Sequence, residues 1–180
     1  MIIKTKNNRQ VLLRRLTPED TDKLSEYLQG LSPDTKKRFG PHQFDKQSII
    51  DIFQQSDKYI GYIAQDLETS EIVAYSVIQL GYLEDDSFRL RSYGLTLDCG
   101  TDCTFAPSVA DKWQSQGIGK GLFKFMFSDL KKLGMKRIIL WGGVQSDNIK
   151  AVNYYNQNGF RALGQFEHNG QNYDMILEIV

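Results

Sequence analysis

The chain has 180 residues, of which 41% are hydrophobic and 24% charged, and its formal net charge is zero. This length and mixture suit one continuous core, so we expect a single domain over residues 1–180. The neutral charge argues against a nucleic-acid partner, because phosphate binding by counterion release needs a basic excess. No segment has the roughly 20 apolar residues that span a bilayer, and the first residues do not form a signal peptide. We therefore expect a cytoplasmic protein without a membrane partner.

Two cysteines, Cys99 and Cys103, are too few for a disulfide framework. Their C-x3-C spacing could supply half of a metal site, but no second Cys or His pair stands nearby to complete it. We expect no metal, and we expect these thiols to be buried or half-buried in a strand.

The N-terminal third is predicted to hold one strand, over residues 11–16, and then helices. Thr17 is a good N-cap and Pro18 suits the first helical position, so a helix should begin there. Ser32 and the proline after it predict a second, short helix by the same logic. A third helix is predicted over residues 45–55.

The middle of the chain favours strands. Residues 59–64 and 72–78 flank a polar turn and predict a β-hairpin. A further strand is expected over residues 88–97, with residues 84–87 as the loop before it. Residues 103–110 predict another strand, in which Pro107 indicates an edge or a bulge because proline cannot donate to the ladder.

The last third changes to an alternation of helices and strands. The predicted elements are a helix over 117–133 that ends at Gly134, a strand over 137–141, a helix from the N-cap region 146–148 to 158, and strands over 161–167 and 173–180 joined by the turn Asn169-Gly170. The pattern predicts a mixed α/β sheet with helices on both faces.

The most informative stretch joins a predicted strand to a predicted helix. It reads Gln114, Ser115, Gln116, Gly117, Ile118, Gly119, Lys120 and Gly121. Its glycines let the backbone approach a ligand, and the helix that follows offers unpaired amides with a partial positive charge. The stretch therefore predicts a pyrophosphate cradle, to which Lys120 and Lys124 could add charge.

This loop has three other interpretations. Glycine-rich turns also occur for packing alone. The loop G-x-x-x-x-G-K-[ST] is absent, because Gly121 follows Lys120. A dinucleotide fingerprint also fails, because Leu122 and Phe123 stand where its third glycine would fall and the motif lies late in the chain.

Two motifs together resemble the GNAT superfamily of acetyl-CoA-dependent N-acetyltransferases. The family's phosphate loop Q/R-x-x-G-x-G/A is matched by Gln114, Gly117 and Gly119. A second pattern, N-x-x-A-x-x-hydrophobic-Y-x-x-x-G-F, is matched by Asn148, Ala151, Tyr154, Tyr155, Gly159 and Phe160. The matches cover residues 103–160. The resemblance implies an α/β fold with a mixed, mostly antiparallel central sheet of about seven strands, helices on both faces and an acyl-CoA cleft between splayed central strands.

The resemblance also implies roles for single residues. Backbone amides from Ser115 to Gly121 should hold the CoA pyrophosphate, and Val109 and Ala110 should pair with the pantetheine amides as an added strand would. A backbone N–H there could polarise the thioester carbonyl. Asn148 should contact the pantetheine arm, and Tyr155 should stand near the thioester sulfur.

Tyr155 is the predicted catalytic acid. A tyrosine with pKa near 10 can give a proton to the leaving thiolate, especially in a water-poor site. The alternative is a core aromatic on the inner face of its helix, a role that suits its neighbour Tyr154 better.

The predicted base is less defined, because the strand before the phosphate loop contains no Glu. Asp102 is the nearest acid and the first candidate, followed by Asp98 and Glu84. Each could equally be an ordinary solvated carboxylate, and a water relay would remove the need for a base. His42 could have a substrate role or lie on the surface.

These observations predict an enzyme that moves an acetyl group from acetyl-CoA to the primary amine of a small molecule. Direct attack in a ternary complex is expected, since no Cys or Ser has a nearby His that would make it a nucleophile. The alternatives are a catalytically silent acyl-CoA sensor or partner module, and a domain for another nucleotide. Aromatic-rich edges make a homodimer possible, and the identity of the acceptor stays open.

Overall fold

The computed structural model describes residues 1–55 and 57–179, and the chain divides into two compact units. Unit 1 contains Met1–Ile78 and Ala106–Ser128, and unit 2 contains Gln79–Phe105 and the chain from Asp129 onward. Each unit is built from two separate stretches, so neither unit is a simple sequence domain. The single domain expected from the sequence stays a prediction.

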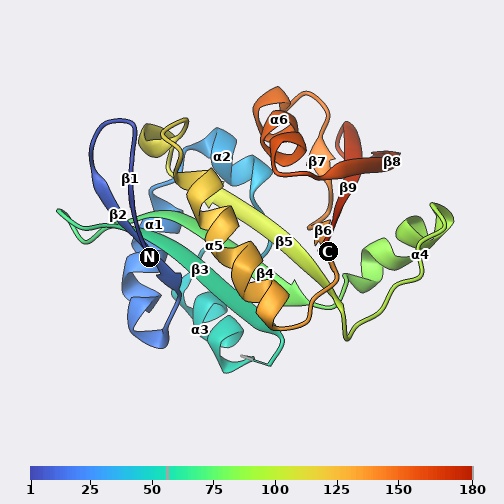
Figure 1. Ribbon diagram of the computed structural model, residues 1–180, viewed down its shortest axis with the longest axis horizontal. Coiled ribbons are helices and arrows are strands. Elements are labelled where there is room, and N and C mark those ends of the chain that lie inside the picture. The colour runs from blue at the N-terminus through green and yellow to red at the C-terminus, as the bar shows by residue number, and fades with distance from the viewer. Residues whose placement is uncertain (56, 180) are drawn as a thin grey trace. The chain divides into compact units, whose positions relative to one another are not determined.

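Unit 1 carries the first half of the sheet (Figure 1). Its strands follow the order β1 (Ile2–Lys4), β2 (Gln10–Arg15), β3 (Tyr59–Asp66), β4 (Ile72–Leu80) and the end of β5 (Asp102–Val109). The pairs β1–β2 and β2–β3 are antiparallel. β4 and β5 each continue into unit 2.

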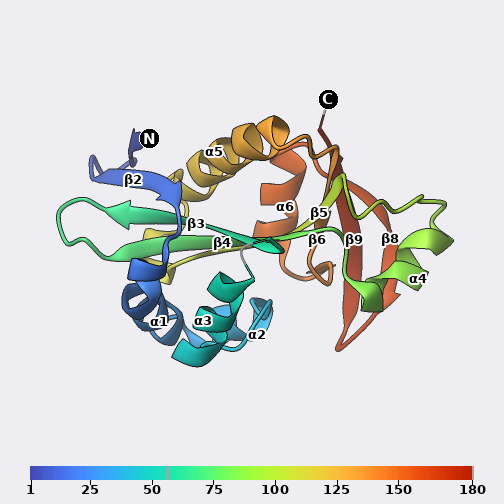
Figure 2. The ribbon, with the colours of Figure 1, turned by 90° about the horizontal axis from the view of Figure 1, so that it is seen from below.

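Helices cover both faces of the unit 1 strands. They are the 3-10 turn η1 (Pro18–Asp20), α1 (Thr21–Gln29), α2 (Pro33–Arg38), α3 (Lys46–Gln54) and α5 (Ile118–Lys132). Figure 2 shows α1 and α3 on one face and α5 on the other. The buried residues include Leu13, Leu24, Leu28, Ile63, Val73, Ile118 and Leu122. Leu24 and Leu28 on α1, and Ile118 and Leu122 on α5, are spaced four residues apart, so each of these helices buries one apolar face.

The predicted helix starts rest on cap chemistry that the structure confirms. Thr17 and Asp20 form a capping box, and the Ser32 hydroxyl accepts the Thr35 N–H at 3.2 Å. The Asp45 carboxylate accepts the Ser48 N–H at 3.0 Å. The Ser32 and Asp45 side chains each satisfy an amide that the first turn of a helix leaves without a partner. At Thr17 it is the Asp20 carboxylate that accepts the Thr17 N–H, at 3.0 Å.

Unit 2 carries the second half of the sheet. β5 pairs in parallel with β6 (Arg137–Leu140), β6 pairs with β9 (Gln171–Glu178), and β9 pairs with both β7 (Val144–Gln145) and β8 (Arg161–Glu167). The β5–β6 register ends at Phe105↔Leu140, while β5 itself runs to Val109. Val180, the last residue of the predicted final strand, lies outside the described residues.

The described part of unit 2 contains the helices α4 (Glu84–Ser92) and α6 (Ile149–Gln157). Figure 2 shows them on opposite sides of β9. On the α4 side, Leu90 packs with Ile139 and Ile176 in a small buried cluster. The Asn148 N-cap, predicted to start α6, accepts the Ala151 N–H at 3.2 Å.

The helix α4 overturns one prediction, because residues 84–87 were expected to be a loop and 88–97 a strand. Glu84 and the two acids after it occupy the first turn, and Arg89 and Arg91 lie in the last turn. Both sets complement the helix dipole. Phe88, the first residue of the expected strand, is 88% exposed, so its side chain does not belong to a buried face.

The sheet as a whole is mixed, mostly antiparallel and open, with helices, as predicted. Among the described residues it has nine strands, where the sequence predicted about seven. The two additional strands are β1 and β7, which have three and two residues. Strands this short carry no alternation that a sequence could reveal.

Candidate functional site

The predicted phosphate loop leaves the 3-10 turn η2 (Asp111–Trp113) and enters α5 in an unusual backbone conformation. Ser115 has φ of 61° and Gly117 has φ of 90°. Only glycine adopts such values freely. Apart from its chain neighbours, no described residue comes within 4 Å of the place where a Cβ on Gly117 would stand. The backbone at Gly117 is therefore open to a ligand.

The two glutamines of the loop turn back onto its main chain. Gln114 Nε2 donates to the Val109 carbonyl at 3.1 Å, and Gln116 Nε2 donates to the Lys112 carbonyl at 3.1 Å. The Gln116 carbonyl in turn accepts the Lys6 N–H at 3.3 Å. These bonds fix the shape of the loop. The Gln114 side chain therefore stabilises the loop conformation, and its predicted contact with the cofactor stays a prediction.

The helix that follows gives the loop an electropositive end. α5 begins at Ile118 and has 15 residues, and the Gly121 N–H bonds to the Gly117 carbonyl at 3.0 Å. The amides of the turn before Gly121 point along the helix axis toward the loop. Together with the helix dipole, this arrangement suits a phosphate. Lys120 and Lys124 are exposed on the same helix.

Gly121 has a different role from the one predicted. A Cβ on it would stand 2.8 Å from Ile3 Cδ1, so the missing side chain lets α5 pack closely against β1. Its N–H is already bonded to Gly117. We therefore keep residues 115–120, and not Gly121, as the candidate cradle.

The two residues predicted to pair with pantetheine, at the end of β5, differ in whether their backbone groups already have partners. The Ala110 N–H donates to the Val73 carbonyl at 3.0 Å, and its carbonyl accepts the Trp113 N–H at 2.8 Å. Both backbone groups of Ala110 are thus used within the protein. Because successive residues of a strand point their N–H groups to opposite edges, the Val109 N–H points away from β4. Val109 stays a candidate, and Ala110 does not.

A set of hydrogen bonds to Asp111, here called the Asp111 brace, lies before the loop and was not predicted from the sequence. The Asp111 carboxylate accepts hydrogen bonds from the Ser32 and Thr35 hydroxyls at 2.9 and 2.8 Å. Burial would raise the pKa of Asp111, but these bonds outweigh it and lower the pKa. The Asp111 brace ties the start of α2 to the loop, and no local pattern could reveal a pair 79 residues apart.

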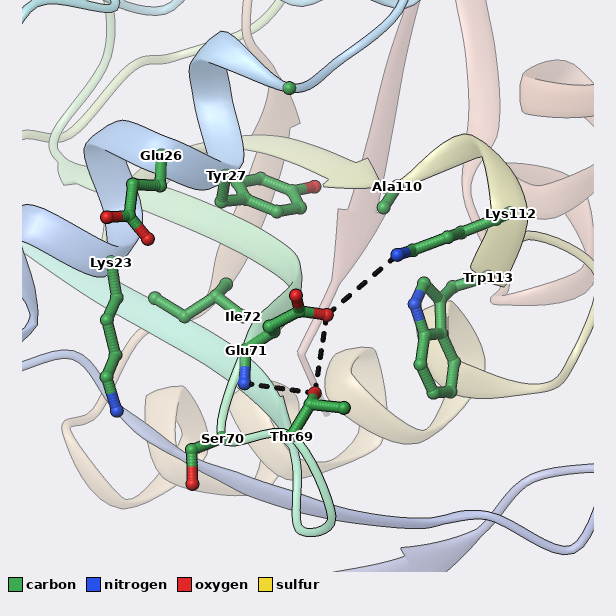
Figure 3. Close-up of a pocket in the computed structure, with 11 residues that line it drawn as sticks. Lys23, Glu26, Tyr27, Thr69, Ser70, Glu71, Ile72, Ala110, Lys112 and Trp113 are labelled. Atoms are coloured by element: carbon green, nitrogen blue, oxygen red, sulfur yellow. Dashed lines mark hydrogen bonds and ion pairs between the residues drawn. The ribbon is translucent and has the colours of Figure 1, made fainter.

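A groove of about 310 Å³ lies beside the loop within unit 1 (Figure 3). Its lining residues are Lys23, Glu26, Tyr27, Gly30, Thr69, Ser70, Glu71, Ile72, Ala110, Lys112 and Trp113. Figure 3 shows Lys112 reaching toward Glu71, and their charged groups lie 3.8 Å apart. The Trp113 indole N–H is buried without a partner among the described residues. Two lysines and two glutamates balance each other, so the charge of the groove favours neither an anion nor a cation.

Tyr155 lies in unit 2, in a buried aromatic cluster. Its ring meets Tyr154, Phe160 and Phe105 at centroid distances of 5.3, 5.4 and 6.4 Å. No described residue forms a hydrogen bond with its hydroxyl. Burial raises the pKa of Tyr155, and it also raises the pKa of Tyr154. A neutral phenol with an unused O–H is the form that a proton donor needs.

Asn148 caps α6 through its side-chain oxygen, as described above. An N-cap uses the carbonyl oxygen and leaves the side-chain NH2 as a donor. The predicted contact of Asn148 with pantetheine therefore rests on that NH2 group.

Asp102, the predicted base, is fully buried in unit 2. Its Oδ1 accepts Arg137 Nε at 2.9 Å and its Oδ2 accepts the Asp98 N–H at 2.9 Å. Both oxygens are occupied, so Asp102 holds structure and we no longer assign it the role of base. Of the other acids, Asp98 bonds its own turn through Gly100 and Thr101. Glu84 lies in the first turn of α4.

The cysteines agree only in part with the prediction. Cys103 is buried in β5, and burial raises the pKa of its thiol to about 12. Cys99 is exposed and lies in a turn, where a buried strand position was expected. Within residues 1–55 and 57–179, no group of three or more His, Cys, Asp or Glu is placed to hold a metal ion. Across that same part of the chain, no helix has the length and apolar character needed to cross a bilayer.

The open mixed sheet and the glycine-rich loop at a helix N-terminus fit the predicted acyl-CoA-dependent acetyltransferase. The model of the acetyltransferase (GNAT) family matches residues 24–160. The chain belongs to this family, and acetyl-CoA is its co-substrate. No curated protein sequence matches the chain.

Solved structures share the fold at low sequence identity. The GNAT domain of S. lividans PAT has a TM-score of 0.76 and 14% identity, with 99% of this chain and 96% of that chain covered. The putative acetyltransferase yncA from Salmonella typhimurium, solved with acetyl-CoA, has a TM-score of 0.70 and 14% identity, with 94% of each chain covered. Spermidine N-acetyltransferase from Vibrio cholerae, in complex with CoA and spermine, has a TM-score of 0.66 and 16% identity, with 93% and 95% covered.

Proposed function

We propose that this protein transfers the acetyl group of acetyl-CoA to the primary amine of a small molecule. The observation that carries this proposal is the loop before α5, where Gly117 is open and its φ is 90°. Family membership supports the donor, because acetyl-CoA brings the pyrophosphate that such a loop suits.

In this proposal, the backbone of residues 115–120 holds the pyrophosphate. Val109 contributes its N–H to the pantetheine arm, and Asn148 contributes its side-chain NH2. The neutral amine attacks the thioester carbonyl, a C–N bond forms and the C–S bond breaks. Tyr155 gives the leaving thiolate a proton. The N–H bond that the amine nitrogen loses on becoming an amide releases a proton, which passes through solvent to the phenolate.

Direct attack in a ternary complex is the proposed route. A covalent acyl-enzyme would need an activated nucleophile. Cys103 is buried and its raised pKa opposes thiolate formation. The two histidines, His42 and His168, lie far from Cys103 in sequence, and no hydrogen bond between a histidine and a cysteine is found among the described residues.

A small-molecule acceptor is the proposed class. The spermidine N-acetyltransferase with the same fold acts on a small polyamine, which supports an amine of this size. We also propose a cytoplasmic location, which the free thiols Cys99 and Cys103 fit, and a homodimer as the assembly to test first.

The proposal is tested by the melting temperature with and without acetyl-CoA, with ATP and NAD in parallel. A ligand that binds only the native state stabilises it by about 2.7 kcal/mol at a hundredfold excess over its dissociation constant. A rise with acetyl-CoA alone should be followed by a screen of small amines for thiol release. A folded sample with no rise would contradict the proposal.

The alternative is a silent acyl-CoA sensor or partner module. It is favoured by one observation, that both oxygens of Asp102 are occupied and β5 has no other carboxylate. Stabilisation by acetyl-CoA without thiol release for any amine or peptide amine would favour this alternative.

A further inference from the structure

The segment between α2 and α3 is attached to β4 by aromatic side chains within unit 1. The His42 ring lies 5.7 Å from the Tyr75 ring and 6.4 Å from the rings of Phe39 and Phe44, measured between centroids. Phe39 also meets Phe44 and Tyr75, each at 6.1 Å. Tyr75 is fully buried and His42 is partly exposed. His42 therefore stands between a buried aromatic wall and the solvent.

The hydrogen bonds of His42 fix its tautomer. Nδ1 lies 2.6 Å from the Gln43 carbonyl oxygen, which can only accept, so Nδ1 carries the proton. Nε2 must then be the bare nitrogen, and it accepts the Tyr75 hydroxyl at 3.2 Å. Nε2 therefore carries the ring's one lone pair that can take up a proton, and in the free protein the Tyr75 O–H is bonded to it.

The charge state agrees with this geometry. Burial lowers the pKa of His42, and the Gln43 carbonyl and the Asp45 carboxylate offset this only in part. Asp45 on its own segment and Tyr75 on β4 are the titratable groups that face it. Since the ordinary pKa of histidine is about 6.5, His42 is neutral at pH 7 and able to take up a proton.

This cluster adjoins the strand segment that we propose contacts the donor. The Tyr27 hydroxyl donates to Ser108 Oγ at 3.0 Å, and Ser108 Oγ donates to the Tyr75 carbonyl at 3.3 Å. Ser108 directly precedes Val109, the residue proposed to bind pantetheine. The backbone of Tyr75 is thereby fixed to the donor-binding end of β5.

We propose that His42 is the general base that removes the proton from the acceptor's ammonium group, and that Tyr75 is a positioning residue for it. This inference rests on the proposed acetyltransferase function. In the step, an N–H bond of the ammonium breaks, its electron pair stays on nitrogen, and the proton forms a new bond to Nε2. For this transfer the ammonium takes the place of the Tyr75 O–H at Nε2. The partly exposed ring later releases the proton to solvent. Aromatic rings around His42 also suit a cationic acceptor before it loses the proton.

The test is the pH profile of His42→Gln with an amine found in the acetyl-CoA screen. Near pH 7, kcat/KM for the amine should fall about 100-fold, within the range that general acid–base catalysis contributes. The KM for acetyl-CoA should stay unchanged. Above the pKa of the amine the deficit should close, because a neutral acceptor no longer needs a base. His168→Gln is the matched control, since His168 is the other histidine and lies exposed in the β8–β9 turn.

A positioning role for Tyr75 has its own readout. Tyr75→Phe should keep the fold and move the acidic limb of the pH profile, with a smaller loss of kcat than His42→Gln causes. Equal activity of wild type and a folded His42→Gln variant across the whole pH range would overturn the inference while leaving the proposed function intact. A wild-type protein that binds acetyl-CoA and acetylates no amine would instead overturn the proposed function, and this inference with it.

Discussion

Arg137 and Asp102 form a buried ion pair that joins the two parallel strands of the sheet. They lie opposite each other in the β5–β6 register, and Arg137 Nε is 2.9 Å from Asp102 Oδ1. The Arg137 side chain is 15% exposed and the Asp102 side chain is not exposed at all. Arg137 also donates to the Thr96 carbonyl at 2.8 Å. The pair therefore holds the start of β5 against β6, and we assign it no part in the reaction.

The first prediction follows from this pair. Asp102→Asn leaves the Arg137 charge buried without its partner, and breaking a buried pair in this way costs about 3 kcal/mol. We expect urea denaturation to show this loss of unfolding free energy, while kcat of the folded fraction changes less than about threefold, as for a residue outside the reacting groups. The double change Asp102→Leu with Arg137→Leu should recover part of the stability, because an apolar pair of similar volume avoids the charge. A large kcat loss in a stable Asp102→Asn protein would restore Asp102 as a catalytic candidate.

The helix starts and the phosphate loop could be predicted because their signals are local. Ser32 and Asp45 satisfy amides three residues on, and the glycines of the loop reveal its backbone freedom. The roles of Ala110 and Gly121 could not be predicted, because they depend on distant partners. Val73 takes the Ala110 N–H, and Ile3 fills the space beside Gly121.

The same contrast explains the failure at α4. Its helix is stabilised by a partner outside the segment: Arg89 pairs with Asp174 of β9 at 2.7 Å and stacks on Phe166 with its guanidinium 3.7 Å from the ring centroid. Asp174 is 85 residues away in the chain. Tertiary contacts of this kind override local propensity.

A second prediction concerns Gly117. Gly117→Ala puts a side chain on a residue with φ of 90°, which costs about 1 to 2 kcal/mol and distorts the cradle. We expect the affinity for acetyl-CoA, measured by calorimetry, to fall at least about tenfold, equivalent to about 1.4 kcal/mol. Gly134→Ala is a matched control, because Gly134 has φ of 79° and similar open space at the end of α5. It should cost comparable stability and leave the affinity for acetyl-CoA unchanged.

A third prediction concerns Tyr155. Tyr155→Phe removes the proposed proton donor, so kcat should fall about 100-fold, in the range of general acid catalysis. The dissociation constant for acetyl-CoA and the melting temperature should hardly change, because the hydroxyl has no hydrogen-bond partner among the described residues. Tyr154→Phe, in the adjacent position, should retain kcat. If the two variants lost activity equally, a packing role for this tyrosine pair would explain the result better than acid catalysis.

A last prediction concerns the pH dependence of stability at His42. Its pKa is lowered by burial, so the unfolded chain takes up a proton before the native state does as the pH falls. The contribution of neutral His42 is therefore fully present above the unfolded pKa of about 6.5 and declines as the pH falls toward the native pKa. Between pH 7.5 and pH 5.5, a range set by that unfolded value, wild type should lose more unfolding free energy than His42→Gln. Urea midpoints at both pH values measure this difference, and His168→Gln should behave like wild type. A slope in His42→Gln as steep as that of wild type would show that His42 is not buried in its neutral form.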